Sequence, residues 1–191
     1  MLSLGFDAFV AHEDIEPSRQ WREAIEEALA TCHALVAYVT PDFRESNWCS
    51  QEVGWALGRG VAVLPVRAGA DPYGFFGAIQ AVNEGGRADV PIAVDIAGAL
   101  TTDILRRGPS RVQAILAEAL VTAFCQSRSF DGTRARYGLL ARLPRSLITQ
   151  EMAERLGSAC SENRQVLDAV VDAPSPSPAP QAISTLLAIG R

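Results

Sequence analysis

The sequence contains no lysine and only two histidines, and its 17 basic side chains are all arginines. Acidic residues number 22, so the formal net charge at pH 7 is −5. A protein that binds nucleic acid without sequence preference needs a basic surface that displaces counterions from the phosphates. The charge balance therefore argues against a general nucleic-acid binder, and we expect no direct nucleic-acid partner.

Long apolar runs are also missing. No stretch of about 18 apolar residues predicts a membrane-spanning helix, and the N-terminal "MLSLGFDAFVAHED" reaches acidic residues too early for a signal peptide. The four cysteines, Cys32, Cys49, Cys125 and Cys160, form no C-x-x-C pair and have no zinc-ligand spacing. We expect a cytoplasmic protein with reduced, buried thiols, no membrane partner and no metal.

Several catalytic motifs are absent as well. There is no P-loop and no G-x-S-x-G, and Gly58 and Gly60 follow a predicted helix rather than a strand, which is the wrong order for a dinucleotide fingerprint. The two histidines, His12 and His33, do not readily build a hydrolytic triad or a metal site. We therefore expect no bound cofactor.

What the sequence does contain is an alternation of apolar runs and amphipathic helices. Continuous apolar runs are typical of strands buried on both faces of a parallel sheet, and four are predicted, at 4–12, 34–40, 61–67 and 90–96. Helices are predicted at 18–32, at 110–126, and from an N-cap at Ser46 or Asn47 to Arg59. The alternation predicts an α/β fold, a three-layer parallel sheet of four to five strands with helices on both faces.

The pattern changes after about residue 128. Helices but no strand are predicted there, at 133–143, 149–160, 163–171 and 181–189, with an extended Pro/Ser linker at 173–180. We expect two domains, 1–127 and a helical C-terminal extension at 128–191. Residues 1–100 carry 14 acidic and 6 basic side chains and residues 101–191 carry 8 and 11, so the balances are −8 and +3. The two halves, or copies of them, can therefore attract each other.

Arginines cluster at the start of the second half. A solvated face is the ordinary interpretation of such a cluster, and the sharper one is a docking strip for the acidic half of a neighbouring subunit or for an anionic activating ligand. The members are Arg128, Arg134, Arg136, Arg142 and Arg145.

The stretch "SNWCSQEVGWALGRG" (46–60) places Glu52 between two tryptophans of a predicted helix. Trp48 lies four residues before Glu52 and Trp55 three residues after it, so the three side chains share one helix face. A helix N-terminus lowers the pKa of a carboxylate and apolar neighbours raise it. Spacing alone favours a solvated glutamate, with both tryptophans as ordinary core aromatics. Tyr73, Phe75 and Phe76 are likewise expected to be core residues around a turn.

Two segments in order, "FDAFVAHED" and "ALVAYVTPDFRESNWCSQEVGWAL", resemble the TIR (Toll/interleukin-receptor) domain family, prokaryotic NAD-cleaving type. The resemblance covers about residues 4–125 and includes a W-x-x-x-E element from Trp48 to Glu52. It implies a flavodoxin-like sheet and cleavage of NAD+ at the nicotinamide–ribose bond, with Glu52 as the catalytic glutamate. It also implies that two loops line the substrate, through His12, Glu13, Asp14, Phe43, Ser46 and Trp48.

The resembling region is shorter than is usual for that family. Only about twenty residues separate the first two predicted strands, enough for one helix. The usual extra helix, strand and "BB" loop have no room there. TIR–TIR contacts that use this loop are therefore in doubt.

The implied reaction needs few protein groups. Nicotinamide leaves NAD+ as a neutral molecule, so no general acid is required, and one carboxylate can stabilise the oxocarbenium-like transition state. An aromatic ring such as Trp48 or Phe43 can stack on a base of the substrate. Arg44 or Arg67 can meet the diphosphate.

Three functions follow from these observations. The first is an NAD+ glycohydrolase or cyclase that releases nicotinamide and ADP-ribose or a cyclic product. It would act in bacterial antiphage or cell-suicide signalling and be activated by homo-oligomerisation through TIR–TIR contacts, with an activating ligand or protein as a further partner. The second is a non-catalytic interaction module that acts through homotypic contacts. The third is a nucleoside or nucleotide N-glycosyl transferase on a related sheet.

Overall fold

The computed structural model of the 191-residue chain describes residues 4–10, 21–86, 88–172 and 175–188. By its contacts the chain divides into two compact units. We call Asp7–Leu100 the sheet unit, and Met1–Phe6 together with Thr101–Arg191 the helical unit. The domain boundary between residues 127 and 128 stays a prediction.

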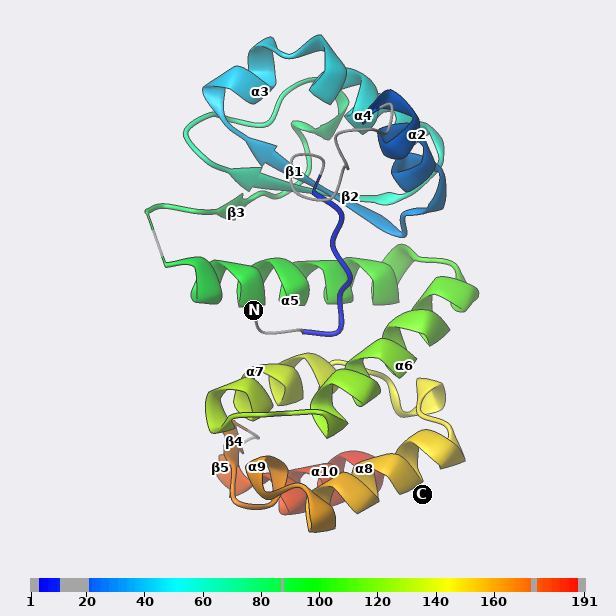
Figure 1. The fold of residues 1–191 in the computed structure, drawn as a ribbon, viewed down its shortest axis with the longest axis vertical. Helices are drawn as coiled ribbons and strands as arrows, with labels where there is room; N and C mark the ends of the chain where they lie inside the picture. The colour runs from blue at the N-terminus through cyan, green and yellow to red at the C-terminus, as the bar shows by residue number, and fades with distance from the viewer. Residues whose placement is uncertain (1–3, 11–20, 87, 173–174, 189–191) are drawn as a thin grey trace. The chain divides into compact units, whose positions relative to one another are not determined.

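The sheet unit contains a parallel sheet of three strands in the order β1-β2-β3 (Figure 1). Its strands are β1 (Ala34–Val39), β2 (Ala62–Arg67) and β3 (Val82–Asn83). Its helices are α2 (Trp21–Thr31), α3 (Pro41–Glu45), α4 (Asn47–Gly58), the 3-10 turn η1 (Gly74–Phe76) and α5 (Asp89–Arg107), which runs on into the helical unit.

One face of this sheet is covered by α4. The strands β1 and β2 pair in register from Ala34↔Ala62 to Val39↔Arg67. Side chains of a strand alternate between faces, and Ala37 and Val39 are buried while Tyr38, between them, is 42% exposed. The core on the α4 side consists of Ala37, Val39, Val53, Ala56, Val63 and Phe76.

The fold class is the predicted one, a mixed α/β fold with a parallel sheet and a helical C-terminal part. The described residues form three strands in this sheet, however, rather than four or five. Residues 4–10 are not a strand, and the backbone bends at Gly5, which has φ +87. Leu4 is buried at 6% exposure, and residues 11 and 12 lie outside the described residues.

The run at 90–96 was expected to be a strand and is instead part of the helix α5. Ile92, Leu100 and Ile104 are buried, at spacings of eight and four residues that suit one face of a helix. Pro91 lies in the first helical turn, where a proline costs no backbone hydrogen bond. A short apolar run cannot distinguish a buried strand from a buried helix. Here the helical spacing of the buried residues continues well beyond the run, and the segment is a helix.

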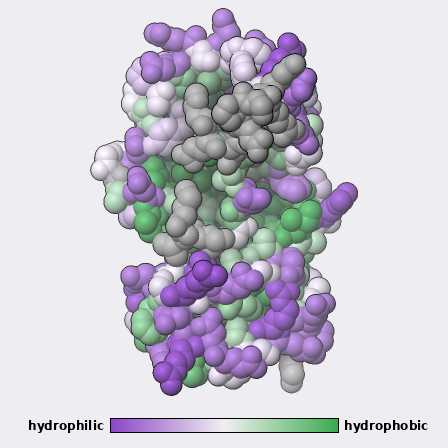
Figure 2. Space-filling view, viewed as in Figure 1, coloured by the Kyte–Doolittle hydropathy of each residue, from purple (hydrophilic) through white to green (hydrophobic). Residues whose placement is uncertain are grey.

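The helical unit packs its helices around a well-filled core. Its elements are α6 (Ser110–Cys125), α7 (Phe130–Leu140), η2 (Arg145–Leu147), α8 (Gln150–Glu162), α9 (Arg164–Leu167), β4 (Val170–Asp172), β5 (Pro176–Pro178) and α10 (Ala179–Ala188). Leu120, Phe124, Leu140 and Leu156 are each at most 1% exposed, and the face seen in Figure 2 is mostly hydrophilic.

The predicted helix at 163–171 is corrected, whereas the predicted Pro/Ser linker at 173–180 is extended at Pro176–Pro178, as expected, but is paired with a second strand. The helix α9 ends at Leu167, and Val170–Asp172 pairs antiparallel with Pro176–Pro178. Val171 and Ala179 are both fully buried. The Pro/Ser segment, as far as the structure describes it, is therefore packed into the helical unit rather than a free spacer.

Candidate functional site

Local sequence signals hold α4, which carries Glu52, in place. The Ser46 hydroxyl oxygen accepts a hydrogen bond from the Cys49 backbone N–H at 3.2 Å, which is a standard N-cap. Gly60 adopts φ +69 just beyond the helix end, as expected for a C-terminal glycine. Val53 and Ala56 are buried and fix the rotation of the helix. Glu52, adjacent to this buried face, is thereby held half-buried.

The ring of Trp48 lies against the ring of Trp21. Their centroids are 4.9 Å apart and the planes meet at 67°, an edge-to-face arrangement that aromatic pairs favour. Trp21 is 48% exposed and Trp48 is 44% exposed. At the other end of the same helices, the Arg59 guanidinium donates to the Leu29 carbonyl oxygen. The two helices α2 and α4 therefore present an exposed aromatic pair on the flank of α4 to which Glu52 belongs.

Glu52 has no partner within the part of the chain that the structure describes. No described side chain or backbone group hydrogen-bonds to its carboxylate or forms an ion pair with it. Burial raises its pKa above the usual value of 4.5, and no opposing cause acts on it. The sequence left open whether the helix N-terminus or the apolar surroundings dominate, and the structure favours the surroundings. A half-buried, unpartnered carboxylate is typical of a functional site.

The remaining predicted substrate residues are distributed around α4. Trp48 shares the flank of Glu52, whereas Phe43 is partly buried and packs edge-on against Phe76 at 6.4 Å. The Arg44 guanidinium lies over the ring of Tyr73, 5.3 Å from its centroid. The structure thus brings Trp48 to Glu52, but sets Phe43 and Arg44 on the opposite flank. Three further candidates, His12, Glu13 and Asp14, lie outside the described residues.

The side chain of Arg67, which was predicted to contact the diphosphate, binds other side chains of the protein. Its Nε donates to Asp71 at 2.5 Å and its Nη1 to Asn83 at 2.6 Å, while the Tyr38 hydroxyl donates to Glu84. Side chains at the C-terminal ends of all three strands are thus hydrogen-bonded to other side chains of the protein. Arg67 therefore stabilises the edge of the sheet.

Sequence reasoning missed Trp21. Trp21, Ile25 and Leu29 follow one another at helical spacing, and Ile25 and Leu29 are buried. Trp21 instead lies against Trp48 and is 48% exposed. This contact joins residues 27 positions apart, so no spacing within one helix predicts it.

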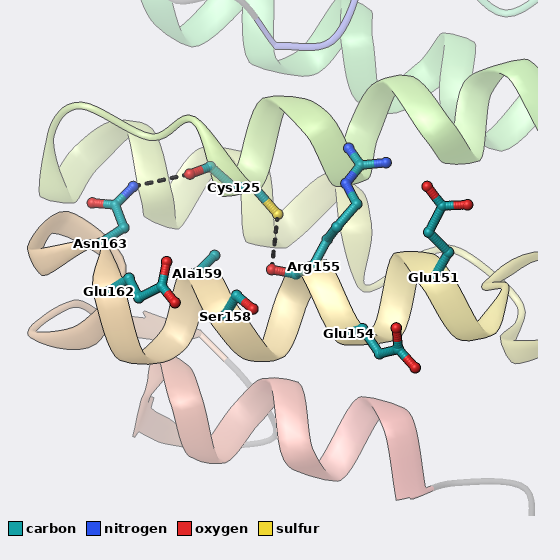
Figure 3. A pocket seen from close by; sticks show the side chains of 8 residues that line it. All are labelled: Cys125, Glu151, Glu154, Arg155, Ser158, Ala159, Glu162 and Asn163. Atoms are coloured by element: carbon teal, nitrogen blue, oxygen red, sulfur yellow. Dashed lines mark hydrogen bonds between the residues drawn. The ribbon is translucent and has the colours of Figure 1, made fainter.

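The helical unit contains a shallow groove between α6 and α8 (Figure 3). Arg155 and Glu151 reach from α8 toward α6, and Arg155 pairs with Glu118 at 2.5 Å. Burial raises the pKa of the Cys125 thiol, and raises that of Cys160 to about 11. Neutral thiols are poor nucleophiles. The groove is lined by Cys125, Glu151, Glu154, Arg155, Ser158, Ala159, Glu162 and Asn163.

The arginines of the cluster are partly engaged within the helical unit, and Arg128, Arg134 and Arg142 are exposed. Arg136 is only 8% exposed, Arg134 pairs with Asp131 at 3.3 Å, and Arg142 donates to Thr102 at 2.9 Å. Arg145 donates to backbone carbonyls. Four of the five arginines thus stabilise the helical unit itself.

Within the described ranges, no group of three or more His, Cys, Asp or Glu side chains could hold a metal ion. No helix in that part of the chain is both long and apolar enough to span a bilayer.

Comparison with known proteins finds a family model that matches the N-terminal part of the chain. The family model described as TIR domain matches residues 2–93. This range contains α2, α4, the sheet and every predicted site residue, and ends inside α5. No curated protein and no solved structure matches the chain.

Proposed function

We propose that the region that matches the TIR domain cleaves NAD+ at the nicotinamide–ribose bond, with Glu52 as the catalytic carboxylate. The observation that carries the proposal is the state of Glu52 itself. It is half-buried, has no partner among the described residues, and lies on the same flank of α4 as the exposed Trp21–Trp48 pair. A purely structural glutamate at this depth would be expected to have a cationic or hydrogen-bonding partner.

The chemistry suits a single carboxylate. When the bond between nicotinamide and ribose breaks, positive charge moves from the pyridinium ring onto the ribose, and nicotinamide leaves as a neutral molecule. An ionised Glu52 stabilises that charge, and the partial exclusion of water strengthens the attraction. The Trp21–Trp48 pair offers a flat aromatic face for a base of the substrate. Water or an atom of the substrate then captures the ribose carbon, which gives ADP-ribose or a cyclic product.

Incubation of NAD+ with concentrated, full-length protein tests the proposal. Chromatography should show nicotinamide and an ADP-ribose product in equal amounts. The Glu52→Gln variant, which has nearly the same shape, should be at least about 100-fold slower. Glu23→Gln is the matched control, because Glu23 is an exposed glutamate of α2. If wild type leaves NAD+ intact at all protein concentrations, or Glu52→Gln keeps the wild-type rate, the proposal is wrong.

A second candidate function is a non-catalytic module that acts through homotypic contacts. Its support is the unusual exposure of large apolar side chains in the sheet unit, where Phe75 is 95% exposed. Contiguous exposed apolar surface commonly marks an interaction site. Under this alternative, Glu52→Gln leaves the biological response intact while substitutions at Phe75 abolish it.

Homotypic contacts and NAD+ cleavage combine in the wider proposal. The protein acts in bacterial antiphage or cell-suicide signalling, and homotypic contacts activate the cleavage. A specific rate of NAD+ cleavage that rises with protein concentration supports this combination, and a rate independent of concentration contradicts it.

A further inference from the structure

Arg59 is an exposed side chain at the end of α4 that contacts the last turn of α2. It is the C-cap residue of α4, and its Nη1 donates to the Leu29 carbonyl oxygen and lies 3.9 Å from the Cys32 sulfur. Leu29 belongs to the last turn of α2, where the helix itself supplies no N–H partner for a carbonyl. The Cys32 thiol donates to the same oxygen at 3.5 Å, but a thiol is a weak donor. Arg59 is therefore the main side-chain partner of this carbonyl.

This contact and the tryptophan pair lie at opposite ends of the same two helices. Trp21 and Trp48 stand at the starts of α2 and α4, whereas Leu29 and Arg59 stand at the other ends. The two helices therefore run side by side in the same direction (Figure 1). Their negative C-terminal ends are neighbours and repel each other, and a cation between them offsets the repulsion. The Arg59 guanidinium is such a cation.

Apart from the tryptophan pair, the other attachments of α2 within the described residues are mainly apolar. Its buried residues Ala24, Ile25 and Leu29 hold it by hydrophobic packing, which has no preferred direction. None of the three belongs to the core between α4 and the sheet. A hydrogen bond between a guanidinium and a carbonyl does have a preferred angle. We infer that Arg59 sets the angle at which α2 crosses α4.

This angle decides where the ring of Trp21 lies. Trp21 is eight residues from Leu29, so at about 1.5 Å per residue it lies about 12 Å along the helix, and a tilt of about 10° moves it by about 2 Å. The rings of Trp21 and Trp48 are in edge-to-face contact with centroids 4.9 Å apart. A shift of that size breaks the contact. Because Trp48 shares its helix flank with Glu52, the aromatic face beside the carboxylate changes as well.

We propose that Arg59 is a positioning residue of the candidate site, which acts through the Leu29 carbonyl to hold Trp21 against Trp48 beside Glu52. Its effect on the tryptophan pair does not depend on any activity, whereas its effect on NAD+ binding rests on the proposed function. Loss of one aromatic contact corresponds to a rise in KM of about 2- to 10-fold. The value of kcat should stay nearly unchanged, because Glu52 keeps its place on α4.

Circular dichroism of the full chain tests the effect on the tryptophan pair without any substrate. Two indole rings in contact couple their electronic transitions and give an exciton couplet, and Trp21→Phe, which removes one indole, marks its absence. Arg59→Met, which has no donor, should lose the couplet and keep the helix signal. Arg59→Lys should keep both, because a single nitrogen, Nη1, makes both contacts of Arg59 and an ammonium can replace it.

The matched control is Arg22→Met, which removes an exposed arginine of α2 that pairs with Glu26 at 2.8 Å. It should keep the couplet, because Arg22 bonds within its own helix. Three results overturn the proposal: a wild type without a couplet, a couplet that Arg59→Met retains, and a helix signal that Arg59→Met loses together with the couplet. A loss of the couplet in Arg59→Lys or in Arg22→Met overturns it as well.

Kinetics with NAD+ test the effect on binding. Arg59→Met should raise KM by about the same factor as Trp21→Ala, and Arg59→Lys should restore it. The double variant that combines Arg59→Met with Trp21→Ala should have no higher KM than Trp21→Ala alone, because Arg59 acts through Trp21. Additive effects overturn the proposal. If no variant and no wild type cleaves NAD+, the proposed function fails, and the couplet still decides the role of Arg59.

Discussion

The two units keep their large apolar side chains in different places. Of the twelve largest fully buried side chains among the described residues, ten belong to the helical unit, and only Val39 and Val66 belong to the sheet unit. Of the thirteen exposed large hydrophobic residues, nine belong to the sheet unit, including its three tryptophans. The helical unit thus resembles an ordinary packed core. The sheet unit keeps its three tryptophans, Phe9, Tyr38 and Phe75 at the surface, where they can contact a ligand or a partner.

The two units also differ in their net charge and in how their charged side chains are bonded. The sheet unit has a balance of −8 and the helical unit one of +3. In the helical unit, arginines of the predicted cluster are bonded to neighbouring groups of that unit. In the sheet unit, Glu52 is left without a described partner. The arginines of the cluster thus bond within the helical unit, whereas the half-buried Glu52 of the sheet unit has no described partner.

The largest expected effect compares two phenylalanines. Phe124 of α6 is fully buried and contacts Tyr137, whereas Phe75 is 95% exposed. Phe124→Ala should lower the free energy of unfolding by about 3–5 kcal/mol, and Phe75→Ala should change it by less than about 0.5 kcal/mol. Urea titrations followed by circular dichroism measure both values. Equal effects of the two substitutions would remove the contrast between the units.

The same experiment can follow each unit separately. All three tryptophans, Trp21, Trp48 and Trp55, belong to the sheet unit, so tryptophan fluorescence reports on that unit alone. We expect Phe124→Ala to shift the circular dichroism transition further than the fluorescence transition. Identical shifts would show that the two units unfold as one.

The next effect is the pH dependence of NAD+ cleavage. Burial raises the pKa of Glu52 above 4.5, and the reaction needs the ionised carboxylate. The rate should therefore fall about tenfold per pH unit below that pKa, on an acidic limb that lies above pH 4.5. Initial rates between pH 4 and 9 measure the limb. A limb at or below 4.5 would contradict the burial of Glu52.

The raised pKa of Glu52 also predicts how the Glu52→Gln substitution changes stability. Because the folded-state pKa lies above the unfolded one, the folded state is favoured below the unfolded pKa and loses this advantage as pH rises through the folded pKa. Glu52→Gln keeps an uncharged side chain at every pH. Its Tm should therefore exceed that of wild type at pH 7, and the difference should disappear near pH 4.

A smaller effect is expected from Asn163 in the helical unit. Its Nδ2 donates to the Cys125 and Ser127 carbonyl oxygens, each at 3.0 Å, and its Oδ1 accepts from the Gln165 N–H. Asn163→Ala leaves these groups unsatisfied and should cost about 1–3 kcal/mol. Asn163→Asp keeps only the acceptor and should recover part of the loss. Ser161→Ala, at an exposed position near the end of α8, is the control, and a cost as small as that of this control would contradict the assignment.

The smallest effect concerns Trp21 in the sheet unit and rests on the proposed activity. Edge-to-face aromatic contacts are worth about 0.5–1.5 kcal/mol. Trp21→Ala should therefore raise KM for NAD+ about 2- to 10-fold with little change in kcat, and Trp21→Phe should restore most of the affinity. A fall in kcat at unchanged KM would show that Trp21 does not act through substrate binding.

The site helix was predictable because its signals are local. The sequence predicted a helix from an N-cap at Ser46 or Asn47 to Arg59, and the structure has Ser46 as the N-cap and Gly58 as the last helical residue. The strands 34–40 and 61–67 were also found within one residue at each end. In these segments the local propensity and the tertiary packing agree.

Other elements failed because the same pattern supports two structures. The run 90–96 is apolar enough for a buried strand, but it lies inside the helix α5, whose apolar residues continue at helical spacing toward its end at Arg107. The run at 4–12 contains Gly5, whose positive φ interrupts the extended backbone. The short strands β3, β4 and β5 have two or three residues each, too few for a recognisable alternation.

The aromatic residues show the same division. Phe76 and Tyr73 pack into the core as expected, but Phe75 between them is exposed. Trp55, expected to be an ordinary packed residue, is 44% exposed. Exposure depends on what lies opposite a side chain, and spacing along one helix or turn does not report that.

The sequence by itself determined a helix with Trp48 and Glu52 on one face, because caps and helical spacing act within a few residues. The tertiary structure alone decided that Trp21, 27 positions before Trp48, lies against it, and that Glu52 is half-buried without a described partner. It also left Phe75 exposed beside an open helix face. Burial and long-range contacts are properties of the packed chain. The opposing effects of the helix N-terminus and of the apolar neighbours on the pKa of Glu52 could therefore be ranked only once the packing was known.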